Sequence, residues 1–147
     1  ALSDITVNLP GRTYLSEEYV PEADERVLWY RKIASAATVG AVEDIYNDMA
    51  GKLPDMPQEA QNLFEKARIK AFANEHHIKT VSVVAGKLVV EPIDIPRDKM
   101  VPVRRAGGRY LSDKRKLQLP LKYFHLTEKD NLFGPVAKFL REMHGEE

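Results

Sequence analysis

Apolar residues at helical spacing dominate the first half of the chain. In the segment 19–36 they fall on one predicted helical face. Pro21 presets the backbone angle of a helix start, and the acidic residues that follow it suit a helix N-terminus. The segment therefore predicts an amphipathic helix whose apolar side packs in the core. The predicted buried face comprises Val27, Trp29, Tyr30, Ile33, Ala34 and Ala37.

Three further segments share the helical period. Thr38 is a good N-cap for a second helix that reaches about Ala50 and is stopped by Gly51. A third helix is predicted over residues 58–75, and a closing helix over residues 131–144. Small alanines on the third helix favour close approach of a neighbouring helix. Its predicted buried residues are Ala60, Phe64, Ala67 and Ala71, with Leu63 and Phe72 at the margins.

After the third helix the apolar period changes from 3.6 to 2. β-Branched runs on either side of residues 85–87 predict a hairpin from the turn chemistry. A second hairpin is predicted over residues 110–121, with one short helix before it at 97–103. Residues 4–9 alternate polar and apolar and predict a short strand. This order predicts an α+β fold, in which a layer of three to four helices packs on a small antiparallel sheet.

The composition is that of a single globular domain over residues 1–147. Lys+Arg and Asp+Glu are both 22, so no global attraction to nucleic acid or membrane follows. The chain contains no cysteine, which excludes disulfides and fits a reducing compartment. No apolar run approaches the ~18 residues of a membrane span, and no signal-peptide pattern opens the chain. We therefore expect a cytoplasmic location, and the start at Ala1 predicts a fragment of a longer protein.

Motifs for catalysis, cofactors and metals are weak. The Gly-Lys pairs at Gly51 and Gly86 lack the upstream glycine of a phosphate-binding loop, and leucine follows each pair. His76 and His77 are neighbours on a predicted helix end, so their side chains point about 100° apart and do not form a His-x-x-x-His pair. We therefore expect no catalytic, cofactor-binding or metal-binding residue, and a small enzyme is the least favoured class.

Two charged clusters are candidate interaction surfaces. Glu43, Asp44 and Asp48 lie opposite the apolar side of the second predicted helix, where they form either a solvated face or a docking surface for a basic partner. A basic segment over residues 104–122, with Tyr110 interleaved, makes a nucleic-acid-binding module the alternative function. The neutral total charge and the lack of a base-reading motif argue against that alternative. The basic residues of the segment are Arg104, Arg105, Arg109, Lys114, Arg115, Lys116 and Lys122.

Several short sequence words occur in a distinctive order. They are Leu15-Ser-Glu-Glu-Tyr-Val-Pro, Tyr30-Arg-Lys-Ile-Ala-Ser-Ala, Met56-Pro57, Asn62-Leu63 and Ala67-Arg-Ile-Lys. With these words the chain resembles the C-terminal domain of bacterial transcription-repair coupling factor, best over residues 4–90. That family is a large ATP-driven DNA translocase, which displaces stalled RNA polymerase and recruits nucleotide-excision repair.

The resemblance implies a regulatory domain that is not itself catalytic. The motor of the family lies outside this domain, so ATP and Mg are implied for the parent protein and no cofactor for the domain. The implied partner of the domain is the N-terminal repair-homology module of the same protein. By docking there, the domain would mask the surface that binds the damage-recognition subunit and would restrain the motor. RNA polymerase, DNA and that subunit are the implied partners of the parent protein.

One departure from the family lies at the end of the second helix. The family usually has an Asp-Arg-aromatic-Gly word there, whereas this chain has Gly51-Lys52-Leu53-Pro54. Lys52 keeps the positive charge, but the aspartate and the aromatic ring are absent. We therefore expect Asp44 and Asp48 to carry the docking ion pairs alone. The docked state is expected to be weaker, or to have a different register, than in the family.

Overall fold

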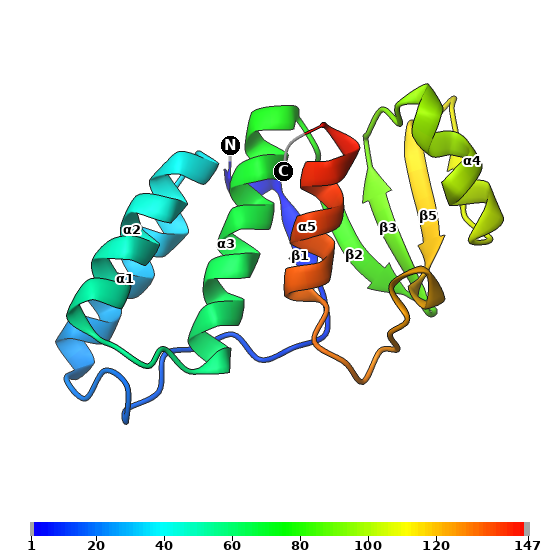
Figure 1. Ribbon diagram of the computed structural model, residues 1–147. Helices are drawn as coiled ribbons and strands as arrows, with labels where there is room; N and C mark the ends of the chain where they lie inside the picture. The colour runs from blue at the N-terminus through cyan, green and yellow to red at the C-terminus, as the bar shows by residue number, and fades with distance from the viewer. Residues whose placement is uncertain (1, 146–147) are drawn as a thin grey trace.

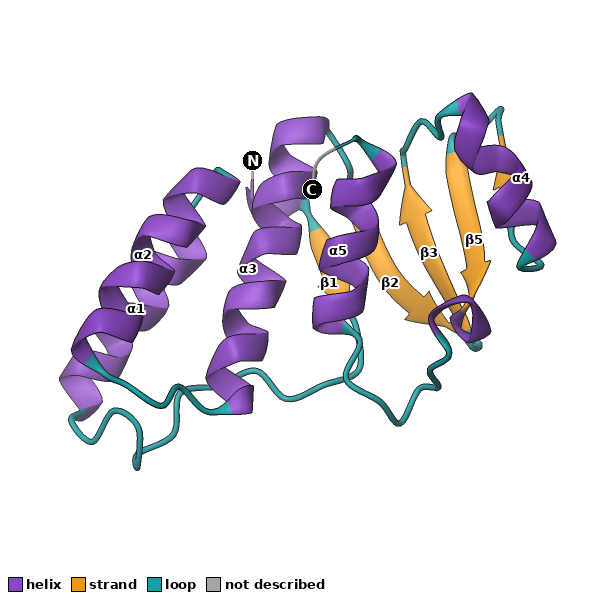
Figure 2. Cartoon of the chain, viewed as in Figure 1, coloured by secondary structure: helices purple, strands orange, loops and turns teal. Residues whose placement is uncertain are grey.

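The computed structural model describes residues 2–145, so Ala1, Glu146 and Glu147 lie outside the description. It combines helices and strands in the order predicted from the sequence (Figures 1 and 2). The helices are α1 (Ala23–Ser35), α2 (Val39–Lys52), α3 (Gln58–His76), α4 (Arg97–Arg105) and α5 (Phe133–Met143), with short 3-10 turns at Leu2–Asp4 and Leu121–Phe124. The strands are β1 (Thr6–Asn8), β2 (Thr80–Val84), β3 (Lys87–Glu91), β4 (Arg109–Leu111) and β5 (Lys116–Pro120). The predicted α+β class is confirmed.

The five strands form one sheet in the order β1-β2-β3-β5-β4. The two hairpins are antiparallel, as predicted, and β3 also pairs with β5 in antiparallel fashion. The sheet is mixed, because β1 pairs with β2 in parallel at one edge, a pairing that the prediction of a small antiparallel sheet did not include. Parallel neighbours need a long crossover, and here α1, α2 and α3 lie between the two strands in the sequence.

One face of the sheet is covered by helices and the other is open. α3, α5 and α4 lie against the covered face, and α1 and α2 pack beyond α3 (Figure 1). Cross-strand neighbours share a face, and the row Val81, Val90, Leu117 is buried under the helices. The adjacent row, which includes Gln118 and Arg109, points to the other face. No helix within residues 2–145 covers that second face, which we call the open face.

Helix α3 is shared between two hydrophobic clusters. Its residues Phe64 and Ala67 belong to a cluster with α1 and α2, whereas Ile69 and Phe72 belong to a cluster with the sheet and α5. Almost the whole circumference of α3 is therefore used for packing, which explains its many small alanines. The predicted buried residues Ala60, Phe64, Ala67 and Ala71 are all buried, and Phe72 is buried as well.

The predicted orientation of the first helix is wrong. Val27 is 45% exposed, and Ala34 and Ala37 are also exposed. The buried stripe of α1 consists of Trp29 and Ile33, one helical turn apart. Both residues belong to the cluster with α2 and α3, and the tryptophan ring has more apolar area to bury than valine or alanine.

The predicted end of the second helix is also wrong. Gly51 does not stop α2, which continues to Lys52. The backbone N–H of Leu53 donates to the carbonyl of Met49 at 2.7 Å, so the hydrogen-bond ladder runs past the glycine. A glycine inside a helix costs about 1 kcal/mol relative to alanine, and tertiary packing offsets that cost here.

Replacing Gly108 with alanine is expected to lower the free energy of unfolding by about 1–3 kcal/mol, because the site is already full. A Cβ atom at this position would lie 2.8 Å from both Val103 Cγ1 and the Val103 carbonyl oxygen. Urea denaturation of the variant measures the change. Gly40→Ala is the control, because its added methyl meets nothing within 4 Å, and it should leave stability unchanged or raised. Equal stability of both variants would contradict the expectation.

Candidate functional site

The predicted second helix is α2, and it carries the predicted acidic face. Two local features hold α2 in place. The hydroxyl oxygen of Thr38 accepts the backbone N–H of Ala41 at 3.1 Å and caps the helix start, as predicted. Val42 and Met49 are buried against α3. The helix is therefore a fixed platform, and its acidic residues have defined positions.

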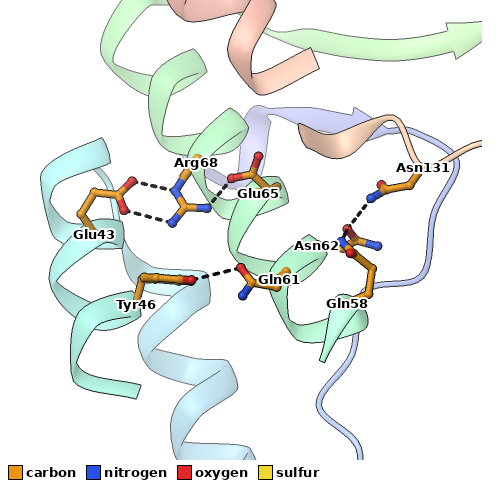
Figure 3. A network of polar contacts seen from close by, with 8 residues as sticks. All are labelled: Glu43, Tyr46, Gln58, Gln61, Asn62, Glu65, Arg68 and Asn131. Carbon is orange, nitrogen blue, oxygen red and sulfur yellow. Dashed lines mark hydrogen bonds and ion pairs between the residues drawn. The ribbon is translucent and has the colours of Figure 1, made fainter. Parts of the chain in front are cut away.

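Glu43 points toward α3 and pairs with Arg68. The guanidinium of Arg68 donates two hydrogen bonds to the Glu43 carboxylate, at 2.6 and 3.0 Å, and a further one to Glu65 (Figure 3). The Arg68 side chain is only 14% exposed and also lies over the Tyr46 ring, 4.9 Å from its centroid. Burial alone would lower the pKa of Arg68, but the two carboxylates outweigh it and raise the pKa above its usual value. Glu43 thus joins α2 to α3.

Asp44 and Asp48 are exposed. Within residues 2–145 no cation lies at ion-pair distance from Asp44. Asp48 pairs with Lys52 one turn further along α2, with 3.1 Å between the carboxylate and the ammonium nitrogen. The structure therefore places the three predicted docking residues on one helix but divides them, because Glu43 is used internally and the two aspartates face solvent.

Lys52 also contacts the first helix. Its ammonium nitrogen lies 5.9 Å from the centroid of the Trp29 ring, which Lys32 approaches at 4.9 Å. Lys52, the residue of the Gly51-Lys52-Leu53-Pro54 segment that keeps a positive charge, is thus engaged with its own domain through a carboxylate and an aromatic ring.

A second polar network surrounds the buried amide of Asn62. Its oxygen accepts from the side-chain amides of Gln58 at 2.8 Å and Asn131 at 2.7 Å (Figure 3). Its nitrogen donates to the carbonyl of Arg12 at 3.0 Å. One side chain thereby joins α3 to the connector before α1 and to the loop before α5. Neither this network nor the Arg68 cluster was predicted from the sequence, although both residues lie in words that carried the family resemblance.

The predicted basic segment is divided between two ends of the sheet. At one end the Arg115 guanidinium binds both carboxylate oxygens of Asp94, at 2.8 and 2.9 Å, and lowers the pKa of that carboxyl. Lys116 lies 3.9 Å from Glu91. The hydroxyl of Tyr110 donates to the carbonyl of Ile93 at 2.7 Å, so this ring is tied to its own domain. Arg104, Arg105, Arg109 and Lys122 lie at the opposite end.

Metal binding, membrane insertion and small-molecule binding each require distinct structural features. Within residues 2–145 no group of three or more His, Asp or Glu side chains is arranged to hold a metal ion. Nor is any helix in that range long and apolar enough to span a bilayer. An apolar groove of about 210 Å³ between α1 and α3 is lined by Tyr30, Ile33 and Leu63. It is smaller than the ~300–1,000 Å³ typical of small-molecule pockets, whereas a more polar hollow of about 740 Å³ is lined by Tyr14, Glu17 and Asp55.

Comparison with known proteins gives consistent matches. A family model described as the TRCF domain matches residues 9–100. Proteins named transcription-repair-coupling factor from Mycobacterium bovis and Mycobacterium tuberculosis are each 22% identical over 121 residues, which is 80% of this chain and 10% of theirs. One of the same name from Bacillus subtilis is 23% identical over 79 residues, or 54% of this chain and 6% of its own. The chain thus spans a tenth or less of these relatives.

A solved structure matches over nearly the whole chain. It is described as the crystal structure of the C-terminal domain of transcription-repair coupling factor, and it superposes with a TM-score of 0.66. The match covers 98% of this chain and 96% of the other, at 14% sequence identity. At that identity the match concerns the fold, and it covers more of the chain than the family model does.

Proposed function

The chain belongs to the TRCF domain family, found in transcription-repair coupling factors, and we propose that it acts in such a protein as a non-catalytic autoregulatory domain. In this proposal the domain docks on the N-terminal repair-homology module of the same protein. Docking masks the surface of that module that binds the damage-recognition subunit, and it restrains the motor. The parent protein would use ATP and Mg and would engage RNA polymerase and DNA.

The observation that carries the proposal is the pair of exposed aspartates on α2. Asp44 and Asp48 present charge of one sign from a helix that the Glu43–Arg68 pair and the Thr38 cap hold in place. Clustered charge on a rigid element favours encounter with a basic partner and fixes the register of the complex. Glu43 has a positioning role in this proposal, because its carboxylate is used to hold α2 against α3.

Lys52 modifies the expected strength of docking. A basic group of the partner has to compete with Lys52 for Asp48, since the two are already paired. The Trp29 ring also holds Lys52 near this site. An ion pair of the partner with Asp48 therefore contributes less binding free energy than one with an unpaired carboxylate. This agrees with the weaker docked state expected from the Gly51-Lys52-Leu53-Pro54 sequence.

Charge reversal at Asp44 and Asp48 tests the proposal. Asp44→Lys with Asp48→Lys in the full-length protein should weaken docking by about tenfold, since exposed ion pairs contribute ~0.2–1 kcal/mol each and reversal adds repulsion. The measured results are tighter binding of the damage-recognition subunit and a higher ATPase rate. Asp24→Lys with Glu25→Lys on α1 makes the same change in net charge elsewhere. If the α2 variant leaves both quantities unchanged, the docking assignment is wrong.

A further inference from the structure

A group of cations gathers at one end of the sheet, far from α2. We call it the cationic corner. Between residues 97 and 122 the chain carries nine basic and two acidic residues, although its total net charge is zero. The fold brings part of this segment together with the start of β3. The cationic corner consists of Lys87, Arg104, Arg105, Arg109 and Lys122, all of which are exposed.

The turn after α4 positions three of these cations. Arg104 and Arg105 form the last turn of α4, and the backbone N–H of Gly107 donates to the Arg104 carbonyl at 2.9 Å. Gly107 has a φ of +81°, which favours glycine, and turns the chain toward Arg109. A Cβ atom at Gly107 would lie 3.9 Å from the Lys122 ammonium nitrogen, so Lys122 extends over this turn.

The remaining cations stand on the open face of the sheet. Arg109 is opposite Gln118, and Lys87 is opposite Pro120, so the two side chains lie on either side of β5 and on the same face. Strands two apart in a sheet are about 10 Å from each other, so the two charges are close without touching. The end of α4 lies beside the lower end of β5 in Figure 1, and the register places Lys87 and Arg109 next to that end.

The cationic corner is not neutralised by the domain itself. Within residues 2–145 no carboxylate lies at ion-pair distance from any of its five side chains. Arg115 and Lys116, at the other end of the sheet, do pair with Asp94 and Glu91. Glu128 lies near the corner, but its carboxylate accepts the backbone N–H of Gly86 at 2.7 Å.

We propose that the cationic corner binds the phosphate backbone of double-stranded nucleic acid, without regard to base sequence. The five cations come from four separate segments, and no carboxylate of residues 2–145 pairs with them, so the site can take several phosphates of one backbone. Single-strand binding usually needs exposed aromatic rings for stacking. Here the hydroxyl of Tyr110 is bound to Ile93, and the rings of Tyr123 and Phe124 pack on Phe139.

This surface is separate from the proposed docking surface. α2 and the cationic corner lie at opposite ends of the domain (Figure 1), with α3, α5 and most of the sheet between them. Both surfaces can therefore be occupied at once, and a failure of one assignment leaves the other intact. The domain would hold its intramolecular partner at one end and a duplex at the other.

Fluorescence anisotropy of the 147-residue chain with two labelled 20-base-pair duplexes of unrelated sequence tests the proposal. If all five cations contact phosphates, the logarithm of the association constant falls linearly with the logarithm of the salt concentration, with a slope of about −4.5. The affinity then falls roughly 500-fold between 50 and 200 mM salt. The triple variant Arg104→Gln, Arg109→Gln, Lys122→Gln should reduce the slope to about −1.8, or roughly 12-fold over the same range.

A matched variant separates the effect of the cationic corner on binding from the effect of total charge. Arg31→Gln, Lys79→Gln, Lys138→Gln removes three exposed cations elsewhere and should bind like the unaltered chain. Circular dichroism confirms that both variants are folded. The proposal is overturned by no binding at 50 mM salt, by equal effects of the two variants, or by tighter binding to polyglutamate or to single-stranded DNA than to duplex. The proposal is supported if the unaltered chain binds both duplexes with equal affinity and only the triple variant of the cationic corner loses that affinity.

Discussion

Phe72→Ala is expected to lower the free energy of unfolding by about 3–5 kcal/mol, the range for removing a buried phenylalanine ring. The ring is 2% exposed and belongs to the cluster that α3 forms with the sheet and α5. It also contacts the imidazole of His76, with 4.2 Å between ring centroids. Since α3 and α5 already pack closely on the sheet, the cavity left by the removed ring cannot collapse fully. The free energy of unfolding should therefore fall by well over about 1 kcal/mol.

Urea denaturation followed by circular dichroism and by fluorescence of Trp29 measures this loss. Trp29 lies in the other cluster, so coincident transitions show that the two clusters unfold together. Val101→Ala is the control, because Val101 is 50% exposed, and it should change stability by less than about 0.5 kcal/mol. A loss at Phe72 as small as at Val101 would mean that the sheet cluster is not close-packed.

Arg68→Met is expected to destabilise the domain by about 2 kcal/mol. The substitution keeps an apolar stem but leaves the carboxylates of Glu43 and Glu65 without their shared partner. Removing one partner of a fully buried pair costs about 3–5 kcal/mol. The Glu43 side chain is 43% exposed, so water screens part of that cost, and we expect the smaller value.

The companion variant removes the carboxylate charges as well. Arg68→Met combined with Glu43→Gln and Glu65→Gln should recover about half of the lost stability, because no uncompensated charge then remains between α2 and α3. Thermal unfolding at several salt concentrations follows both variants. Were the combined variant less stable than the single one, the loss at Arg68 would come from packing on Tyr46 and not from charge.

Elements with strong local signals were predicted from the sequence. The β2–β3 hairpin turns at Ala85 and Gly86, both of which have positive φ, as the turn chemistry required. α3 was predicted within one residue at its end because its period is long and regular. The parallel pairing of β1 was not predictable in this way, because alternation specifies the face of a strand and not its neighbour.

The contacts between residues of different helices at the site were not predicted from the sequence. A helical period gives the apolar side of α2, and it correctly left Asp44 and Asp48 exposed. It does not say which residue of another helix lies opposite Glu43, and Arg68 is 25 positions away. In α1 the period offered several apolar residues for one face, and only Trp29 and Ile33 are buried. Pairwise packing of this kind depends on the tertiary structure.

The parallel edge of the sheet has a consequence for the order of folding. Thr6 pairs with Thr80, so closing this contact encloses 74 positions of chain. The entropy cost of closure rises with loop length, whereas the β2–β3 hairpin closes over a few residues. We therefore expect β1 to join the sheet after α1, α2 and α3 have compacted the chain between the two strands. During synthesis from the N-terminus, the first strand of the sheet therefore waits for its partner until the three helices between the two strands have been made.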